Sequence, residues 1–118
     1  MNNAIDLYRE AQDALERVWF VQAVQVTART TNTLSLRLII RPALFVHVFL
    51  SERSGALYFA LVKNDERIFG IDRVNGKWHL HPNKSPKVHQ DLVEGLEPKP
   101  LLKFLARVEE LLQEYSLI

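Results

Sequence analysis

The chain contains no cysteine. This absence excludes disulfides, thiolate metal sites and a cysteine nucleophile, and it is typical of proteins in a reducing interior. Long apolar runs are also lacking, since no stretch approaches the roughly 20 residues needed to cross a bilayer. The N-terminus carries acidic residues where a signal peptide needs a basic start and an unbroken apolar run. We therefore expect a soluble cytoplasmic protein with no membrane partner.

The sequence also lacks an excess of either charge. Its 15 basic and 14 acidic residues give a formal net charge of +1, so nucleic-acid binding would require a local basic patch. No nucleophile elbow, phosphate-binding P-loop or dinucleotide glycine pattern is present. The composition, 47% hydrophobic and 25% charged, is that of an ordinary globular protein, and the length of 118 residues predicts a single domain over residues 1–118.

Two amphipathic segments lie at the ends of the chain. Near the N-terminus, apolar residues recur at spacings of three and four, and charged residues, Glu10 included, cover the other side, which predicts a helix. Asn2 or Asn3 is the expected N-cap. A second apolar stripe follows Pro98 and Pro100 and predicts a C-terminal helix. The two stripes are Ile5, Tyr8, Ala11, Leu15 and Val18, and Leu101, Leu105, Val108, Leu112 and Tyr115.

Between these helices the sequence has the alternation and the β-branched and aromatic content of strands. Turn residues separate the strand-like segments, and residues 88–96 could add one or two helical turns. The order predicts an α+β fold: an antiparallel meander sheet of about six strands flanked by N-terminal and C-terminal helices. Closure of the meander into a barrel is the alternative. The expected strands are residues 20–30, 34–40, 44–50, 55–63, 67–74 and 77–81.

One hairpin can be predicted residue by residue. Asn75-Gly76 between two strand-like runs favours a two-residue type I′ turn, because both residues can adopt positive φ. In such a hairpin the numbers of facing residues have a constant sum. Asp72 then faces His79 and Gly70 faces His81, with Cβ atoms roughly 4.5–5.5 Å apart. The opposite face of the hairpin is predicted to carry Ile71, Trp78 and Leu80.

The register of the preceding hairpin is open at this point. If Asn64-Asp65 is also a two-residue turn, Asp72 shares a face with Leu57 and Phe59. Its carboxylate would then lie among apolar side chains in a semi-buried site. Alternatively the turn is longer, and the register between the two strands changes.

The histidine-rich segment 71–90, IDRVNGKWHLHPNKSPKVHQ, is the strongest candidate for chemistry. A carboxylate beside an imidazole fixes its tautomer and favours the imidazolium, as a general acid or base requires. We expect the catalytic residues of a nuclease-like site here: His79 or His81 as general base or acid, and His89 as the second acid–base group. Asp72 would orient one of these rings. Basic and aromatic side chains of the same segment would contact a phosphodiester substrate: Arg73, Lys77, Trp78, Lys84 and Lys87.

Three other interpretations of this segment stay open. A divalent metal could be held by His79, His81 and His89, with Asp72 as a further ligand or as the partner that orients a histidine. No His-Glu-x-x-His or cysteine pattern supports a metal, so we expect no cofactor. The segment could instead bind a protein or a nucleic acid without chemistry, or it could be a structural hairpin with a satisfied Asp–His pair.

Candidates outside this segment are weaker. His47 lies mid-strand, between Phe45 and Phe49 on its own face, and is interpreted as a core or edge histidine. Glu66 and Arg67 are interpreted as loop charges.

The strand FGIDR, the short turn and the segment WHLHPNKSPKVHQ, followed by an amphipathic helix, resemble the TumE-type toxins of prokaryotic toxin–antitoxin systems. Members of that family have a meander sheet, an Asp-containing strand end and a His/Pro-rich segment near the C-terminus. The resemblance covers residues 20–115, with motif-level similarity in residues 69–91. The positions that correspond are Asp72, His79, His81, Pro82 and His89.

The chain departs from the family pattern at two points. Arg73 follows Asp72 where the family has a small polar residue, and the histidines alternate with Leu80 instead of being adjacent. The resemblance implies an antitoxin-like protein partner and a cellular target, with RNA as the target we expect. It implies no particular reaction; an enzyme of this kind would be a nuclease-like hydrolase, metal-independent or metal-assisted. The alternative is a non-catalytic protein- or nucleic-acid-binding module, with a homodimer formed through the open sheet edge.

Overall fold

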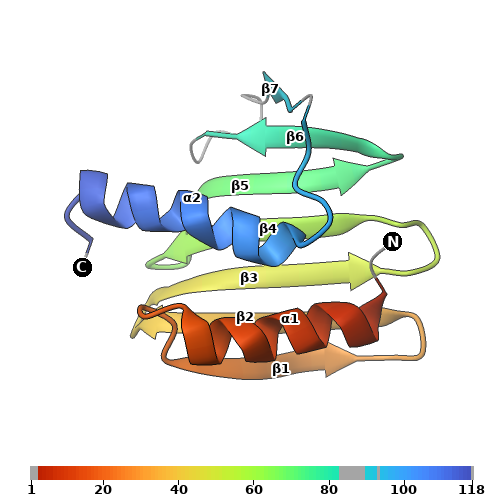
Figure 1. Cartoon of the computed structure of the whole chain (residues 1–118), viewed down its shortest axis with the longest axis horizontal. Coiled ribbons are helices and arrows are strands. Elements are labelled where there is room, and N and C mark those ends of the chain that lie inside the picture. Colours follow the sequence, from red (N-terminus) through yellow and green to blue (C-terminus); the bar gives the residue numbers. More distant parts are fainter. Residues whose placement is uncertain (1–2, 83–89, 93, 118) are drawn as a thin grey trace.

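The computed structural model describes residues 3–82, 90–92 and 94–117, which form an α+β fold (Figure 1). Seven antiparallel strands lie in one open sheet in the order of the sequence, so the predicted meander is confirmed. Both predicted helices are present, and the seventh strand is an addition to the six expected. The elements are α1 (Ala4–Arg17), β1 (Ala23–Arg29), β2 (Thr33–Arg41), β3 (Leu44–Ser51), β4 (Leu57–Lys63), β5 (Glu66–Val74), β6 (Lys77–His81), β7 (Gln90–Asp91) and α2 (Pro100–Glu114).

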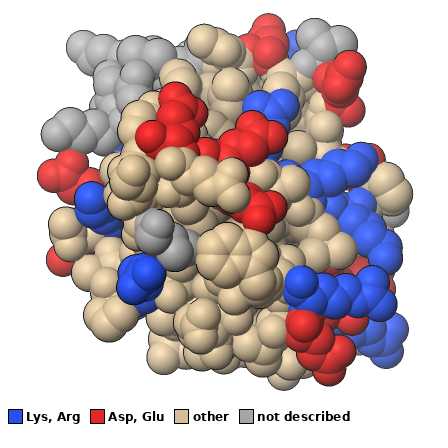
Figure 2. All heavy atoms as spheres, turned by 60° about the vertical axis from the view of Figure 1, so that its left-hand side comes forward, with Lys and Arg blue, Asp and Glu red and all other residues tan. Residues whose placement is uncertain are grey.

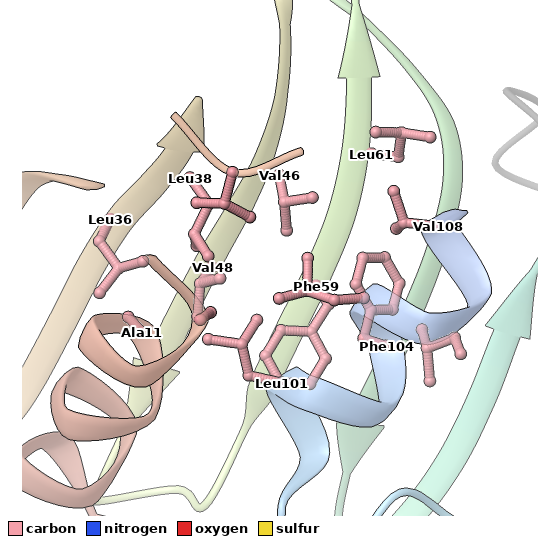
Figure 3. Packing of buried hydrophobic residues seen from close by; sticks show 14 of the residues in the cluster. Ala11, Leu36, Leu38, Val46, Val48, Phe59, Leu61, Leu101, Phe104 and Val108 are labelled. Atoms are coloured by element: carbon pink, nitrogen blue, oxygen red, sulfur yellow. The ribbon is translucent and has the colours of Figure 1, made fainter. Parts of the chain in front are cut away.

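Both helices pack on the same face of the sheet and form the hydrophobic core with it (Figure 1). On β2 and β3 every second side chain is buried, as expected for strands with one covered face. Figure 3 shows Phe59 of β4 against Phe104 of α2, whose ring centroids are 5.3 Å apart. Because burial of one such side chain stabilises a fold by about 1.5–3 kcal/mol, these contacts decide which face of the sheet is inside.

Helix α1 begins as predicted, but its buried face coincides only in part with the predicted stripe. Asn3 is the N-cap, and its side-chain oxygen accepts a hydrogen bond from the Asp6 N–H at 2.8 Å. The predicted apolar stripe is wrong in detail, because Ile5 is 54% exposed and Leu15 is 36% exposed. The buried residues of α1 are Leu7, Glu10, Ala11 and Ala14.

Glu10 explains this orientation, because its buried carboxylate joins the two helices. Its Oε2 accepts a hydrogen bond of 2.8 Å from the Leu102 N–H in the first turn of α2. Lys99, the N-cap residue of α2, makes no side-chain capping bond, so Glu10 caps α2 from the other helix. Burial raises the pKa of Glu10, while the hydrogen bonds from the Leu102 and Leu101 backbone act to lower it. The sequence prediction had placed Glu10 on the solvent side.

A β-bulge resolves the register between β4 and β5. Asn64-Asp65 is a two-residue turn in which both residues have positive φ, so a longer turn is not needed. Beyond the turn the pairing with β4 skips from Arg67 to Phe69. Ile68 is therefore an extra residue of β5 with no partner in β4, which defines a bulge.

This bulge decides where Asp72 points, because a one-residue slip exchanges the two faces of a strand. Asp72 pairs with Tyr58 and not with Leu57. Tyr58 is 40% exposed, whereas Leu57 is fully buried under the helices. The Asp72 side chain therefore lies on the face of the sheet that the helices leave uncovered.

The C-terminal part differs from expectation in two places. Of residues 88–96, those that the structure describes are not helical, and Gln90–Asp91 form β7. Tyr115 follows α2 and is 62% exposed, whereas Phe104, which the predicted stripe omitted, is fully buried. The other four positions of that stripe are buried as predicted.

The molecular surface has no single dominant charge in the view of Figure 2. Lys, Arg, Asp and Glu side chains are mixed there, with neutral atoms between them. This distribution agrees with the formal net charge of +1. Within the described ranges, neither helix has the length and apolar character needed to span a membrane.

Candidate acid–base site

The uncovered face of the sheet carries the candidate site. Paired residues of neighbouring strands form rows across this face. One row runs from Phe49 in β3 through Tyr58 and Asp72 to His79 in β6 and Asp91 in β7. Because neighbouring strands lie about 4.8 Å apart, consecutive members of this row are direct neighbours.

The hairpin between β5 and β6 has the predicted register. Asn75-Gly76 forms its turn, with φ values of 53° and 76°. Asp72 pairs with His79, and Gly70 pairs with His81. This prediction from the sequence is confirmed.

The carboxylate of Asp72 contacts both histidines of β6. Its Oδ2 lies 2.7 Å from Nε2 of His81, and its Oδ1 lies 3.4 Å from Nδ1 of His79. The shorter contact is thus with the diagonal neighbour and not with the residue directly opposite. Strand twist brings diagonal neighbours within reach of long side chains.

The two histidines differ in their access to solvent. The His81 side chain is 15% exposed; Asp72 engages its Nε2, and its Nδ1 is buried. The His79 side chain is 25% exposed, and its Nε2 lies 3.8 Å from Oδ1 of Asp91, whose side chain is 85% exposed. His79 therefore directs Nε2 toward the solvent side of the site, whereas His81 anchors the carboxylate.

Arg73 and Trp78 lie on the covered face, across the sheet from the histidines. Arg73 donates from Nε and Nη2 to the Gly55 carbonyl, at 3.3 and 3.1 Å, and forms an ion pair with Glu97. Its guanidinium lies 5.5 Å from the centroid of the Trp78 ring. Gly95 approaches the same ring so closely that an added Cβ would lie 2.6 Å from it. Arg73 and Trp78 therefore hold the segments that contain Gly55, Gly95 and Glu97 against the sheet.

The remaining predicted residues divide into two groups. Lys77 is exposed at the start of β6, two residues from His79 and hence on the same face of the strand. Lys84, Lys87 and His89 lie outside the described residues. Within the described residues, no three His, Cys, Asp or Glu side chains are grouped so that they could hold a metal ion. A metal site that includes His89 stays a prediction.

His47 also lies on the uncovered face, in β3. Its Nε2 is 3.1 Å from Oγ of Ser35, which in turn is 2.9 Å from Oγ1 of Thr27. Burial lowers the pKa of His47, and the positive charge of Arg37 lowers it further. His47 therefore favours its neutral form and is part of a polar row between strands.

Three side chains near the cluster were not identified from the sequence. Tyr58 and Phe49 form an aromatic pair with ring centroids 6.0 Å apart. Arg67 belongs to β5 and not to a loop, as does Glu66. The Cδ of Arg67 lies 3.3 Å from the position of an added Cβ on Gly70. Alternation within β3 and β4 places Phe49 and Tyr58 on one face, but the bulge at Ile68 hides the alignment of this face with Arg67 and Asp72 in β5.

No protein-family model matches the chain, and no curated protein or solved structure matches it either. The resemblance to TumE-type toxins therefore stays a prediction. Fold and site together define an α+β meander-sheet protein with an Asp–His cluster on the uncovered face of its sheet.

Proposed function

We propose that the cluster of Asp72, His79 and His81 is an acid–base site that cleaves RNA. In this proposal the chain is the toxin of a prokaryotic toxin–antitoxin pair, acts in the cytoplasm and is inhibited by a protein partner. One observation carries the proposal: the Asp72 carboxylate contacts both histidines on a face that the helices leave uncovered. The motif resemblance to TumE-type toxins supports the choice of target.

The geometry favours different roles for the two histidines. Nδ1 of His79 faces Asp72, which selects the tautomer in which Nε2 accepts a proton. Asp72 also stabilises the imidazolium that forms after proton transfer. His81 is a positioning residue, because it bonds the second carboxylate oxygen and so fixes the direction of the first.

On RNA these groups would promote an internal transesterification that cleaves the phosphodiester backbone. The 2′-hydroxyl gives its proton to Nε2 of His79, and its oxygen attacks the adjacent phosphorus. The bond from phosphorus to the 5′ oxygen breaks, which leaves a 2′,3′-cyclic phosphate and a 5′-hydroxyl. The leaving oxygen takes its proton from water or from His89, the further acid–base group predicted from the sequence. Lys77 would stabilise the negative charge on the phosphate.

A non-catalytic binding module is the second candidate function. The aromatic pair of Phe49 and Tyr58 on the same face favours it, because such side chains bind partners without taking part in chemistry. In that case the Asp72 cluster would be a structural feature of the hairpin.

Expression in a bacterial host tests the toxin proposal. Wild type should arrest growth and cause RNA decay, whereas a folded His79→Ala variant should not. His47→Gln is the matched control, because it removes a histidine of the same face that does not belong to the Asp72 cluster. A harmless wild type, or toxicity that survives in His79→Ala, would contradict the proposal.

A further inference from the structure

We infer that the uncovered face binds single-stranded RNA, with Tyr58 as a stacking surface for a base and Arg67 as a phosphate contact. This inference rests on the proposed function and specifies the form of nucleic acid that the site takes. It assigns the substrate contacts to Tyr58 and Arg67, which share a face with the histidines. Trp78 and Arg73, the contacts predicted from the sequence, lie on the covered face.

Tyr58 is placed to hold a base next to the reacting groups. It is the cross-strand partner of Asp72, so its ring lies one strand away from the cluster. It is 40% exposed, and it is supported on the far side by Phe49, with a tilt of 44° between the rings. An exposed ring held by a second ring is a preformed surface for base stacking, which needs no particular base identity.

Arg67 supplies the second, independent observation. Its Nε is buried and has no hydrogen-bond partner in the part of the chain that the structure describes. Because Nε is closed to solvent, a ligand would contact the terminal Nη nitrogens of this half-buried residue. The Arg67 side chain passes over Gly70, the cross-strand partner of His81, and therefore lies beside the cluster. The Nη nitrogens of a guanidinium can donate two hydrogen bonds to a phosphate, which makes Arg67 the phosphate contact of this proposal.

The charge of the face agrees with a polyanionic ligand. Arg37, Arg67 and Lys77 contribute positive charge on this face. Among the described residues, the carboxylates on this face are Asp72 and Asp91, and both lie beside His79. The helices on the other face carry half of the 14 acidic residues of the chain: Asp6, Glu10, Asp13, Glu16, Glu109, Glu110 and Glu114.

A single strand fits the face better than a duplex. In a duplex the bases are stacked on each other and the major groove is too narrow for side chains, so a flat aromatic surface cannot reach them. A single strand can place one base on Tyr58 while its backbone passes Asp72 and His79 in the next two strands. A second copy of the chain could also cover an aromatic face, and the experiment separates the two occupants.

Binding of a non-cleavable 2′-O-methyl RNA octamer to the full chain tests the role of Tyr58. Tyr58→Ala should weaken binding about tenfold, since stacking contributes roughly 1–3 kcal/mol per base. Tyr58→Phe should bind like wild type because it keeps the ring. Tyr115→Ala is the matched control: it removes an exposed tyrosine at the end of α2, and should leave affinity within about twofold. Equal affinity of Tyr58→Ala and wild type would overturn the inference.

The salt dependence of the same binding tests Arg67. Arg67→Gln should weaken binding and lower the slope of log K against log salt by about 0.7, the value for one phosphate contact on a single strand. Arg53→Gln, in an exposed turn, should change neither quantity. An unchanged slope in Arg67→Gln would show that Arg67 does not contact a phosphate.

The outcomes also distinguish this inference from the proposed function. If wild type binds the octamer through Tyr58 but leaves natural RNA intact, the proposed cleavage fails and the binding face stands. If wild type cleaves RNA but Tyr58→Ala and Arg67→Gln keep its KM, the cleavage stands and the inference fails. Loss of a dimer in Tyr58→Ala, with no RNA binding by wild type, would show that a second copy occupies the face and would overturn the inference.

Discussion

Nε2 of His81 lies 2.7 Å from Oδ2 of Asp72, although the residue directly opposite Asp72 in the hairpin is His79. The carboxylate therefore has one short contact with the less exposed histidine, His81, and one longer contact with the more exposed histidine, His79. A carboxylate that is held on one side can orient a ring on the other, which is the arrangement that acid–base catalysis requires. From this asymmetry we expect unequal effects of substituting the two histidines.

The first prediction compares these substitutions in purified protein. His79→Ala should lower the rate of RNA cleavage about a hundredfold or more, because it removes the proton acceptor. His81→Ala should cost about tenfold, and His81→Gln should recover most of that loss, because an amide can still donate to Asp72. A larger loss in His81→Ala than in His79→Ala would reverse the assigned roles.

The second prediction concerns the coupling of Asp72 and His81. Asp72→Asn should lower the rate about a hundredfold or more, because the amide no longer fixes the ring of His79. If His81 acts only through Asp72, adding His81→Ala to Asp72→Asn should cause no further loss, although His81→Ala alone costs about tenfold. The four rates of this double-mutant cycle give the coupling. Fully additive losses would show that His81 acts on the substrate by itself.

The third prediction concerns the bulge in β5. Ile68 has no partner in β4, so its deletion should leave the register of the other strand residues unchanged. The variant should fold cooperatively and lose about 1–2 kcal/mol of stability, the contribution of one partly buried isoleucine. Circular dichroism and urea unfolding would measure this.

Deletion of Val48 is the matched control for Ile68. Val48 lies in a regular strand with partners on both sides, and its removal would exchange the faces of the rest of β3. This variant should not fold. Equal disruption by the two deletions would show that Ile68 is not a dispensable bulge residue.

The fourth prediction concerns the pH dependence of stability through Glu10. Burial raises its pKa above the usual 4.5, so the folded chain holds the proton to higher pH than the unfolded chain does. The stabilising effect of protonation is fully present below the unfolded value and is lost as pH rises through the folded pKa. The free energy of unfolding of wild type relative to Glu10→Gln should therefore fall as the pH rises from below the usual pKa of 4.5 through the raised pKa of the folded chain.

Glu16→Gln is the control for this measurement, since it removes one carboxylate from an exposed position of the same helix. An increase in the stability of wild type relative to Glu10→Gln with rising pH would contradict the account. Glu10→Ala should lower the free energy of unfolding by about 1–3 kcal/mol, because the Leu102 N–H would lose its acceptor.

Much of the fold could be predicted because its signals are local. Alternation identified the buried leucines of β2, and Asn75-Gly76 determined the pairing of Asp72 with His79, since a two-residue turn leaves no freedom in register. The bulge at Ile68 could not be predicted, because it depends on which of two faces the helices cover. The burial of Glu10 likewise depends on a contact with residue 102, far along the chain.

The candidate site was predictable in its membership but not in its roles. The turn at Asn75-Gly76 predicts that Asp72, His79 and His81 share one face of the hairpin. The shorter contact with His81, in contrast, follows from strand twist. Alternation correctly predicted Trp78 on the face opposite the histidines, which conflicts with its assignment as a substrate contact. Tyr58 and Arg67 belong to the face through tertiary pairing across the bulge, and no short motif marks them.

Analysis of the RNA ends left by the purified chain tests the central claim most directly. A short single-stranded RNA and its copy with a 2′-deoxy sugar at the cleaved position would be incubated with wild type and with His79→Ala, with and without a chelator. The account predicts 2′,3′-cyclic phosphate and 5′-hydroxyl ends from wild type in both conditions, and no cleavage of the deoxy copy or by His79→Ala. Intact RNA with wild type, or equal cleavage of the deoxy copy, would contradict it.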